Sequence, residues 1–146
     1  MGTQQILLIV LSVIIVGVAI AVGITMFSNQ AYNGNQQAVA SELQNYGAQC
    51  IQYFKTPKAQ GGAGQDSTDV TVAKVSAFIG FSAASPYFLK SDNGEFRVTA
   101  VSGSPATVTL VGLGTEEKGG SKPKITTTVA LTPGTISSTL GTGTGF

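Results

Sequence analysis

The sequence predicts an α+β fold in which one long N-terminal α-helix packs, through its C-terminal half, on a four-stranded antiparallel β-sheet. A long apolar run near the N-terminus is followed by an amphipathic stretch, and no proline occurs before Pro57. Beyond Pro57, four short segments rich in Thr, Val and Ile alternate with turn residues. A sheet of this kind needs one face covered, and the amphipathic stretch is the obvious cover.

The first element is the apolar segment 6–27. About 20 apolar residues at 1.5 Å each cross the hydrocarbon core of a bilayer, which is about 30 Å thick. The first charged side chain is Glu42, so the segment lacks the basic flanks that orient an ordinary membrane anchor or open a secretory signal peptide. We therefore expect residues 1–27 to be a membrane segment or filament core and residues 28–55 to be an amphipathic half.

In the amphipathic half, apolar residues recur every three or four positions and so predict one stripe along a helix. The stripe consists of Ala38, Val39, Leu43, Tyr46, Gly47, Cys50, Ile51 and Phe54. Pro57 ends the helix, because the residue before a proline disfavours helical geometry. A helix of about 50 residues is about 75 Å long.

Gly17, Gly23 and Gly34 are the weak points of this helix, since each glycine costs up to about 1 kcal/mol relative to alanine. Close helix packing is one interpretation of these glycines. A locally melted stretch is the alternative, and Gly34, between two asparagines, is the expected position of a kink.

Residues 56–146 are expected to form a β-rich globular head. Glycines predict a flexible loop over 60–65. A short helix is predicted over 68–79, with a strand as the alternative, and residues 66–69 offer N-caps for it. Strands are predicted over 95–101, 106–113, 124–131 and 135–140, linked as an antiparallel meander. The tail, 141–146, is either a loose end or an arm that docks on a neighbouring molecule.

Composition excludes several classes of function. Charged residues are 10% of the chain and the net charge is +1, so the sequence does not indicate nucleic-acid binding. The chain has no histidine and one cysteine, which excludes an internal disulfide, the common zinc ligand sets and a catalytic Ser-His-Asp or Cys-His arrangement. We therefore expect no enzyme activity, no cofactor and no metal.

The remaining chemistry-bearing side chains have structural interpretations. The acidic residues at 66, 69, 116 and 117 are interpreted as solvated turn carboxylates, because they lack the spacing of a calcium loop. Cys50 lies on the apolar stripe and is expected to be buried. Glu42 is expected to face a groove, to pair with a lysine of another subunit, or to be solvated.

The first ten residues, Met1-Gly2-Thr3-Gln4-Gln5-Ile6-Leu7-Leu8-Ile9-Val10, resemble the start of a mature type IV pilin. The resemblance covers residues 1–55, and the rest of the chain only in architecture. It implies that a prepilin peptidase produces a chain starting at Met1 and that Met1 is N-methylated. The family usually has a glutamate where this chain has Gln5, which offers a hydrogen bond but no charge.

The resemblance further implies a major structural subunit that polymerises into an extracellular type IV pilus-like filament for adhesion, motility or surface contact. The subunit is membrane-inserted before assembly, and its partners are further copies of itself and inner-membrane assembly machinery with an ATPase. The expected assembly residues are Met1, Thr3, Gln4, Gln5, Ile6, Leu7, Ile9, Val10, Ile14, Val18 and Phe27. The alternatives are a pseudopilin of a type II-like secretion system and a membrane-anchored surface binding protein.

Overall fold

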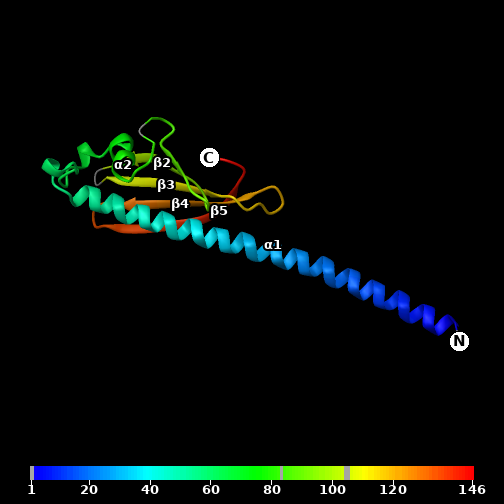
Figure 1. The fold of residues 1–146 in the computed structure, drawn as a ribbon. Coiled ribbons are helices and arrows are strands. Elements are labelled where there is room, and N and C mark those ends of the chain that lie inside the picture. Colours follow the sequence, from blue (N-terminus) through cyan, green and yellow to red (C-terminus); the bar gives the residue numbers. More distant parts are fainter. Residues whose placement is uncertain (1, 83, 104–105) are drawn as a thin grey trace.

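The chain folds into one long helix and a small sheet-based head. The computed structural model describes residues 2–82, 84–103 and 106–146. Helix α1, Gly2–Lys55, has 54 residues and therefore extends about 80 Å. Its first half projects beyond the head, and its second half lies along the sheet (Figure 1). The predicted α+β class, with the helix as the cover of the sheet, is confirmed.

The head contains a five-stranded antiparallel sheet in which each strand pairs with the next one in sequence. The strands are β1 (Phe88–Lys90), β2 (Gly94–Ser102), β3 (Thr107–Gly114), β4 (Lys122–Ala130) and β5 (Thr135–Gly143). The last four correspond to the predicted segments, but the predicted count of four is wrong. β1 was missed because three residues are too few to show strand periodicity, and only their pairing with residues 95–97 of β2 defines them as a strand.

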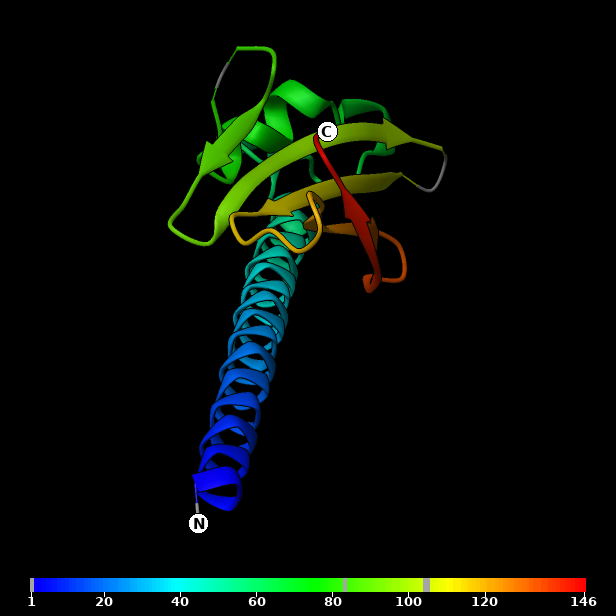
Figure 2. The same ribbon diagram turned by 90° about the vertical axis from the view of Figure 1, so that its right-hand side faces the viewer.

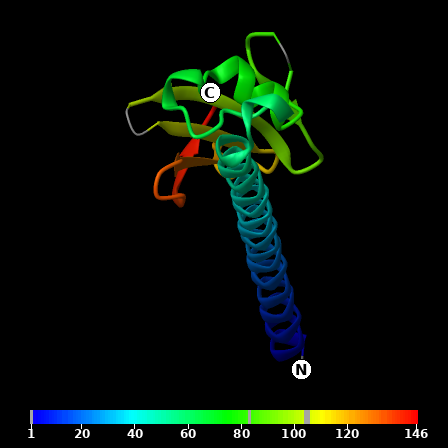
Figure 3. The same ribbon diagram turned by 90° about the vertical axis from the view of Figure 1, so that its left-hand side faces the viewer.

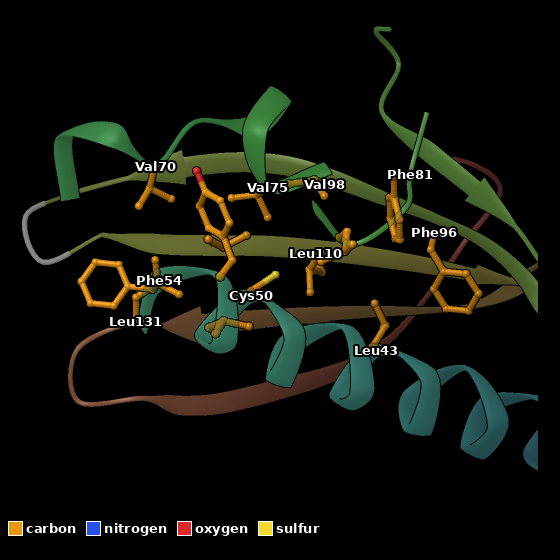
Figure 4. Close-up of a cluster of buried hydrophobic side chains, with 14 of the residues drawn as sticks. Leu43, Cys50, Phe54, Val70, Val75, Phe81, Phe96, Val98, Leu110 and Leu131 are labelled. Carbon is orange, nitrogen blue, oxygen red and sulfur yellow. The ribbon is translucent and has the colours of Figure 1, made fainter. Parts of the chain in front are cut away.

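α1 covers one face of the sheet with the predicted apolar stripe. Val39, Leu43 and Cys50 are fully buried, and Figure 4 shows Leu43 and Cys50 rising from α1 toward the strands. Ala38, Tyr46 and Ile51 are half-buried at the margins of the stripe. The main partners in the sheet are Phe96, Val98, Val108, Leu110, Ile125 and Val129, all buried in the same core.

Two glycines allow α1 to lie close to the sheet. A Cβ atom on Gly112 would stand 2.7 Å from Cγ1 of Val39, and one on Gly47 would stand 3.1 Å from Cγ2 of Val129 and 3.2 Å from Cδ1 of Ile136. α1 is thus above β3 at position 39 and above β4 and β5 at position 47. The helix crosses the sheet diagonally.

The segment that follows α1 folds back and caps it. The amide of Ala63 donates a hydrogen bond to the carbonyl of Tyr53 at 3.0 Å, and the amide of Gln65 donates to the carbonyl of Phe54 at 2.8 Å. Gly61 adopts the left-handed region at φ 83°. These bonds satisfy carbonyls of the last helical turn, which otherwise lack partners. The region predicted as a flexible loop therefore has a defined structure.

The short helix predicted over 68–79 is divided in two. A 3-10 helix, Ser67–Asp69, precedes α2, Val72–Phe78. The two are separated because Val70 is extended and buried, and because Thr71 starts α2 by accepting a hydrogen bond from the amide of Lys74. Figure 3 views this end of the head, opposite to the free end of α1.

The C-terminal tail packs on the sheet of its own chain. β5 extends to Gly143, and the residues after it return across the sheet (Figure 2). Nζ of Lys124 donates to the carbonyl of Gly145 at 2.9 Å, and the guanidinium of Arg97 lies 4.1 Å from the centre of the Phe146 ring. The tail is therefore not a loose end. Docking of the tail on a neighbouring molecule stays a prediction.

Candidate assembly surface

The N-terminal half of α1 presents an exposed apolar surface. Every residue from Gly2 to Gln30 is exposed, and the large apolar side chains of this part range from 50% exposed at Leu11 to 76% at Phe27. Contiguous apolar surface of this size marks a contact with protein or membrane. Among the described residues, α1 is the one helix long and apolar enough to cross a membrane.

All of the predicted assembly residues that the structure describes lie on this projecting part. They are Thr3, Gln4, Gln5, Ile6, Leu7, Ile9, Val10, Ile14, Val18 and Phe27, and each is exposed. Met1 lies outside the described residues. Thr3, Leu7, Val10, Ile14 and Val18 follow one another at spacings of three and four and so share one side of the helix.

The apolar character of this half is not confined to one side. Ile15, Val16, Ile20 and Ile24 are also between 56% and 66% exposed, although they lie on other sides of the helix than Ile14. A helix that is apolar all round is stable only when it is surrounded, in a protein interior or in a membrane. The segment therefore needs apolar neighbours in every direction.

The two hydroxyl groups inside the apolar segment do not oppose burial. Oγ of Ser12 donates to the carbonyl of Ile9 at 2.8 Å, and Oγ1 of Thr25 donates to the carbonyl of Val22 at 2.8 Å. Each hydroxyl is thus satisfied within the helix, as is typical of Ser and Thr in membrane helices. The segment can be transferred between lipid and protein without a lost hydrogen bond at these positions.

Asn35 holds α1 at the point where the helix leaves the head. Its Nδ2 donates to the carbonyl of Asn93 at 2.8 Å. Its Oδ1 accepts from the amide of Thr115 at 3.1 Å and from the amide of Glu116 at 3.3 Å. One side chain thereby joins the helix to the β1–β2 turn and to the β3–β4 connection. A Cβ on Gly114 would stand only 2.1 Å from Oδ1 of Asn35, so these hydrogen bonds of Asn35 also require a glycine at position 114.

Glu42 makes a second polar attachment, seven residues further along the same side of α1. Oγ of Ser91 donates to its carboxylate at 3.0 Å, and Nδ2 of Asn93 also donates to it. The expectation of a solvated Glu42 is corrected, because its carboxylate is bonded to head residues of the same chain. A contact with a lysine of another subunit stays a prediction. The approach of Ser91 and Asn93 depends on the β1–β2 turn: the sequence indicates a turn at Asp92-Asn93-Gly94, but not that this turn lies beside α1.

Sequence reasoning missed Asn35 and Tyr32 as head contacts. Tyr32 is 8% exposed, seven residues before Val39, and this spacing extends the stripe one step further than the predicted start at Ala38. Asn35 and Glu42 are likewise seven apart and flank the stripe. Two polar residues at this spacing beside an apolar stripe could have indicated that α1 contacts the head there.

The helix is continuous through Gly34, directly before Asn35. A Cβ at Gly34, Gly17 or Gly23 would meet nothing within 4 Å, so close packing at these glycines requires another molecule. A kink at Gly34 in the assembled state stays a prediction.

Cys50 is buried as predicted. It is fully inaccessible, and burial raises the pKa of its thiol to about 12. At neutral pH the thiol is protonated and does not act as a nucleophile.

The charges at the tip of the head pair with one another. Nζ of Lys58 lies 2.8 Å from Oδ2 of Asp66, and Lys74 pairs with Asp69. The hydrogen bond from Lys58, followed by those from Thr68, lowers the pKa of Asp66 below its ordinary range. Among the described residues, no three potential metal ligands form a cluster.

Comparison with known proteins adds no relative. No protein-family model matches the chain, and no curated protein or solved structure is significantly similar to it.

Proposed function

We propose that this protein is a pilin-like structural subunit that polymerises through the apolar half of α1 into an extracellular helical filament. The observation that carries the proposal is the complete exposure of residues 2–30 on a helix whose other half is firmly packed into a head. A rod that is apolar all round and is rigidly joined to a compact head suits a polymer with a helical core and heads on its outside. The resemblance of residues 1–10 to mature type IV pilins supports the same function.

The mechanism is association rather than catalysis. Before assembly, residues 6–27 hold the subunit in the membrane. On extraction these side chains bundle with helices of other copies, so apolar surface passes from lipid to protein without meeting water. Contacts that join different surfaces of successive subunits and do not close into a ring give an open helical polymer. Extraction requires assembly machinery with an ATPase, and the pilin resemblance also calls for a prepilin peptidase.

The polar start of α1 must be satisfied within the filament. Gln4 and Gln5 are exposed in the single chain, and an unmade hydrogen bond in a buried core costs about 1 to 3 kcal/mol. We therefore assign to Thr3, Gln4 and Gln5 the role of bonding between subunits at the N-terminal end of the core. Gln5 takes the place of the usual glutamate as a neutral partner for a neighbouring N-terminal amine.

The test is cryo-electron microscopy of filaments sheared from the surface of cells that produce the protein, with an intact mass spectrum of the subunit. We expect helical filaments with residues 6–27 in the core and a subunit that begins at Met1, with or without an added methyl group. Short filaments that are not displayed on the surface would favour a pseudopilin. A detergent-extracted monomer without filaments would overturn the proposal in favour of a membrane-anchored binding protein.

A variant of the apolar segment distinguishes a filament core from a simple membrane anchor. In this variant, every apolar residue between 6 and 27, including Gly17 and Gly23, is replaced by leucine. The segment stays apolar, but the shape of the helix surface changes. A membrane anchor tolerates this change, whereas close helix packing at Gly17 and Gly23 does not. We expect membrane insertion to be retained and filaments to be lost; filaments in normal amount would contradict helix-specific packing.

A further inference from the structure

The two edges of the sheet differ in how they are protected. β1 has three residues and ends at Lys90, and short strands and lysines are common devices that prevent pairing with other molecules. β5 has nine residues and pairs with β4 alone in the described sheet. Residues 125–146 contain no charged side chain. The β5 edge is therefore the open side of the head.

Leu140 is the most exposed large apolar side chain of the head. It is 59% exposed, compared with 37% for Phe78, 38% for Phe88 and 40% for Phe146. It stands opposite Ile125 in the β4–β5 register, and Ile125 is fully buried under α1. Leu140 therefore points to the face that α1 covers, but α1 does not cover it.

The diagonal course of α1 explains this gap in the cover. The helix meets β5 at Ile136, beside Gly47, and approaches β3 at Gly112, beside Val39. The second half of β5, where Leu140 lies, is thus left uncovered beside the part of α1 that precedes Gly47. Ala40 lies seven residues before Gly47 and so on the same side of the helix, and it is half-buried. We call Ala40, Ile136 and Leu140 the Leu140 patch.

We propose that the Leu140 patch receives the apolar half of α1 from a neighbouring copy of this chain. The patch continues along the side of α1 toward the projecting half, so a second helix laid beside the first would contact both. It is apolar and uncharged, as is the segment 6–27. That segment needs apolar neighbours on all sides. In a bundle of such helices, the outer ones have helices on their inner side only, so another apolar surface must cover their outer side. This inference rests on the proposed polymerisation and names the head surface that takes part in it.

The first experiment is disulfide cross-linking in assembled filaments. Leu140→Cys is combined with single cysteines at Val10, Ile14, Val18 and Val22, and the matched control is Thr139→Cys, which lies next in the strand and points to the opposite face. Native Cys50 is buried and protonated and does not compete. We expect linked dimers with Leu140→Cys at one or two helix positions, and at least about tenfold less with Thr139→Cys, because only side chains on the contacting face come within disulfide distance.

The results distinguish the possible occupants of the patch. Equal linkage from both strand positions, or none from Leu140→Cys at any of the four helix positions, would overturn the proposal. Linkage of Leu140→Cys to itself without any helix partner would also overturn it, since this indicates pairing between two β5 edges. If the wild-type chain forms filaments, any of these results contradicts only the role of the Leu140 patch. If the wild-type chain forms no filaments, the proposed function itself is contradicted.

A charge substitution gives an independent test. Leu140→Glu places a carboxylate against the incoming helix, and Thr139→Glu places one on the other face of β5. We expect the surface yield of filament to fall at least about tenfold with Leu140→Glu and less than about twofold with Thr139→Glu, because an unpaired charge is not tolerated in an apolar contact. The thermal midpoint of the head should change by less than about 2 °C in both, since both positions are exposed. Normal filament yield from Leu140→Glu would overturn the inference.

Discussion

The two halves of α1 share one continuous helix but differ in what surrounds them. From Tyr32 onward, one stripe of the helix is buried against the sheet and the remainder is polar or exposed. From Gly2 to Gln30, apolar side chains cover every side and none is buried. The amphipathic half contributes to the stability of the head within one chain. The apolar half stabilises nothing in the single chain and is available to membrane or to other copies.

The angular distribution of apolar residues around a helix indicates what surrounds each part of it. A stripe predicts one partner surface, and an apolar circumference predicts surroundings on all sides. If the division is correct, equivalent substitutions in the two halves should have opposite consequences.

Leu43→Ala and Ile14→Ala remove the same kind of side chain from the two halves. Leu43 is fully buried between α1 and the sheet, whereas Ile14 is 56% exposed. We expect Leu43→Ala to reduce the free energy of unfolding of the head by about 2 to 5 kcal/mol, through lost burial and a residual cavity. Ile14→Ala should leave it within about 0.5 kcal/mol. Chemical denaturation in detergent, followed by circular dichroism of the sheet, measures both.

Filament yield should respond to the substitution in the apolar half even though the stability of the head does not. Ile14→Ala should weaken assembly while the head melts normally, which separates the two readouts. Equal destabilisation of the head by both substitutions would contradict the division of α1 into two halves, because it would mean that the apolar half supports the head within a single chain.

Asn35→Ala tests the border between the halves. The substitution removes the bonds to Asn93, Thr115 and Glu116, and we expect a loss of about 1 to 2 kcal/mol, because the freed amides lie where water can reach them. Gln37→Ala is the matched control, since Gln37 is an exposed residue of α1 two positions from Asn35 and lies off the buried stripe. Hydrogen exchange should become faster in the 91–94 and 114–117 segments with Asn35→Ala and stay unchanged with Gln37→Ala. Unchanged exchange in both would show that the apolar stripe alone fixes the border.

Much of this arrangement could be predicted from the sequence, because it depends on periodicity. The length of α1, the stripe from Val39 to Phe54 and the burial of Cys50 all follow from spacings of three and four. Four of the strands follow from β-branched residues between turns. These are local signals, and the structure bears them out.

The features that could not be predicted depend on contacts between distant segments. β1 exists only by pairing with β2, and the partners of Glu42 are about 50 residues away in sequence. The close approach at Gly112 and the uncovered position of Leu140 both follow from the diagonal course of α1, which no local pattern encodes. In the candidate assembly surface, the exposed apolar run could be predicted from composition, whereas the head contacts of Tyr32 and Asn35 could not.

Gly34→Ala gives the smallest expected effect and locates the border most finely. Gly34 is exposed on α1 between the buried Tyr32 and Asn35, and a Cβ there would meet nothing within 4 Å. The substitution should therefore stabilise the helix by up to about 1 kcal/mol without a clash. Because a Cβ at position 34 would touch no head residue, the unfolding of the head should not change, and the gain should be confined to slower hydrogen exchange of amides around 30–34. If the filament extends by melting at this glycine, Gly34→Ala filaments should also lengthen less under a given pulling force. Faster unfolding of the head in this variant would contradict the prediction, since it would show that a side chain at position 34 disturbs the packing of the head.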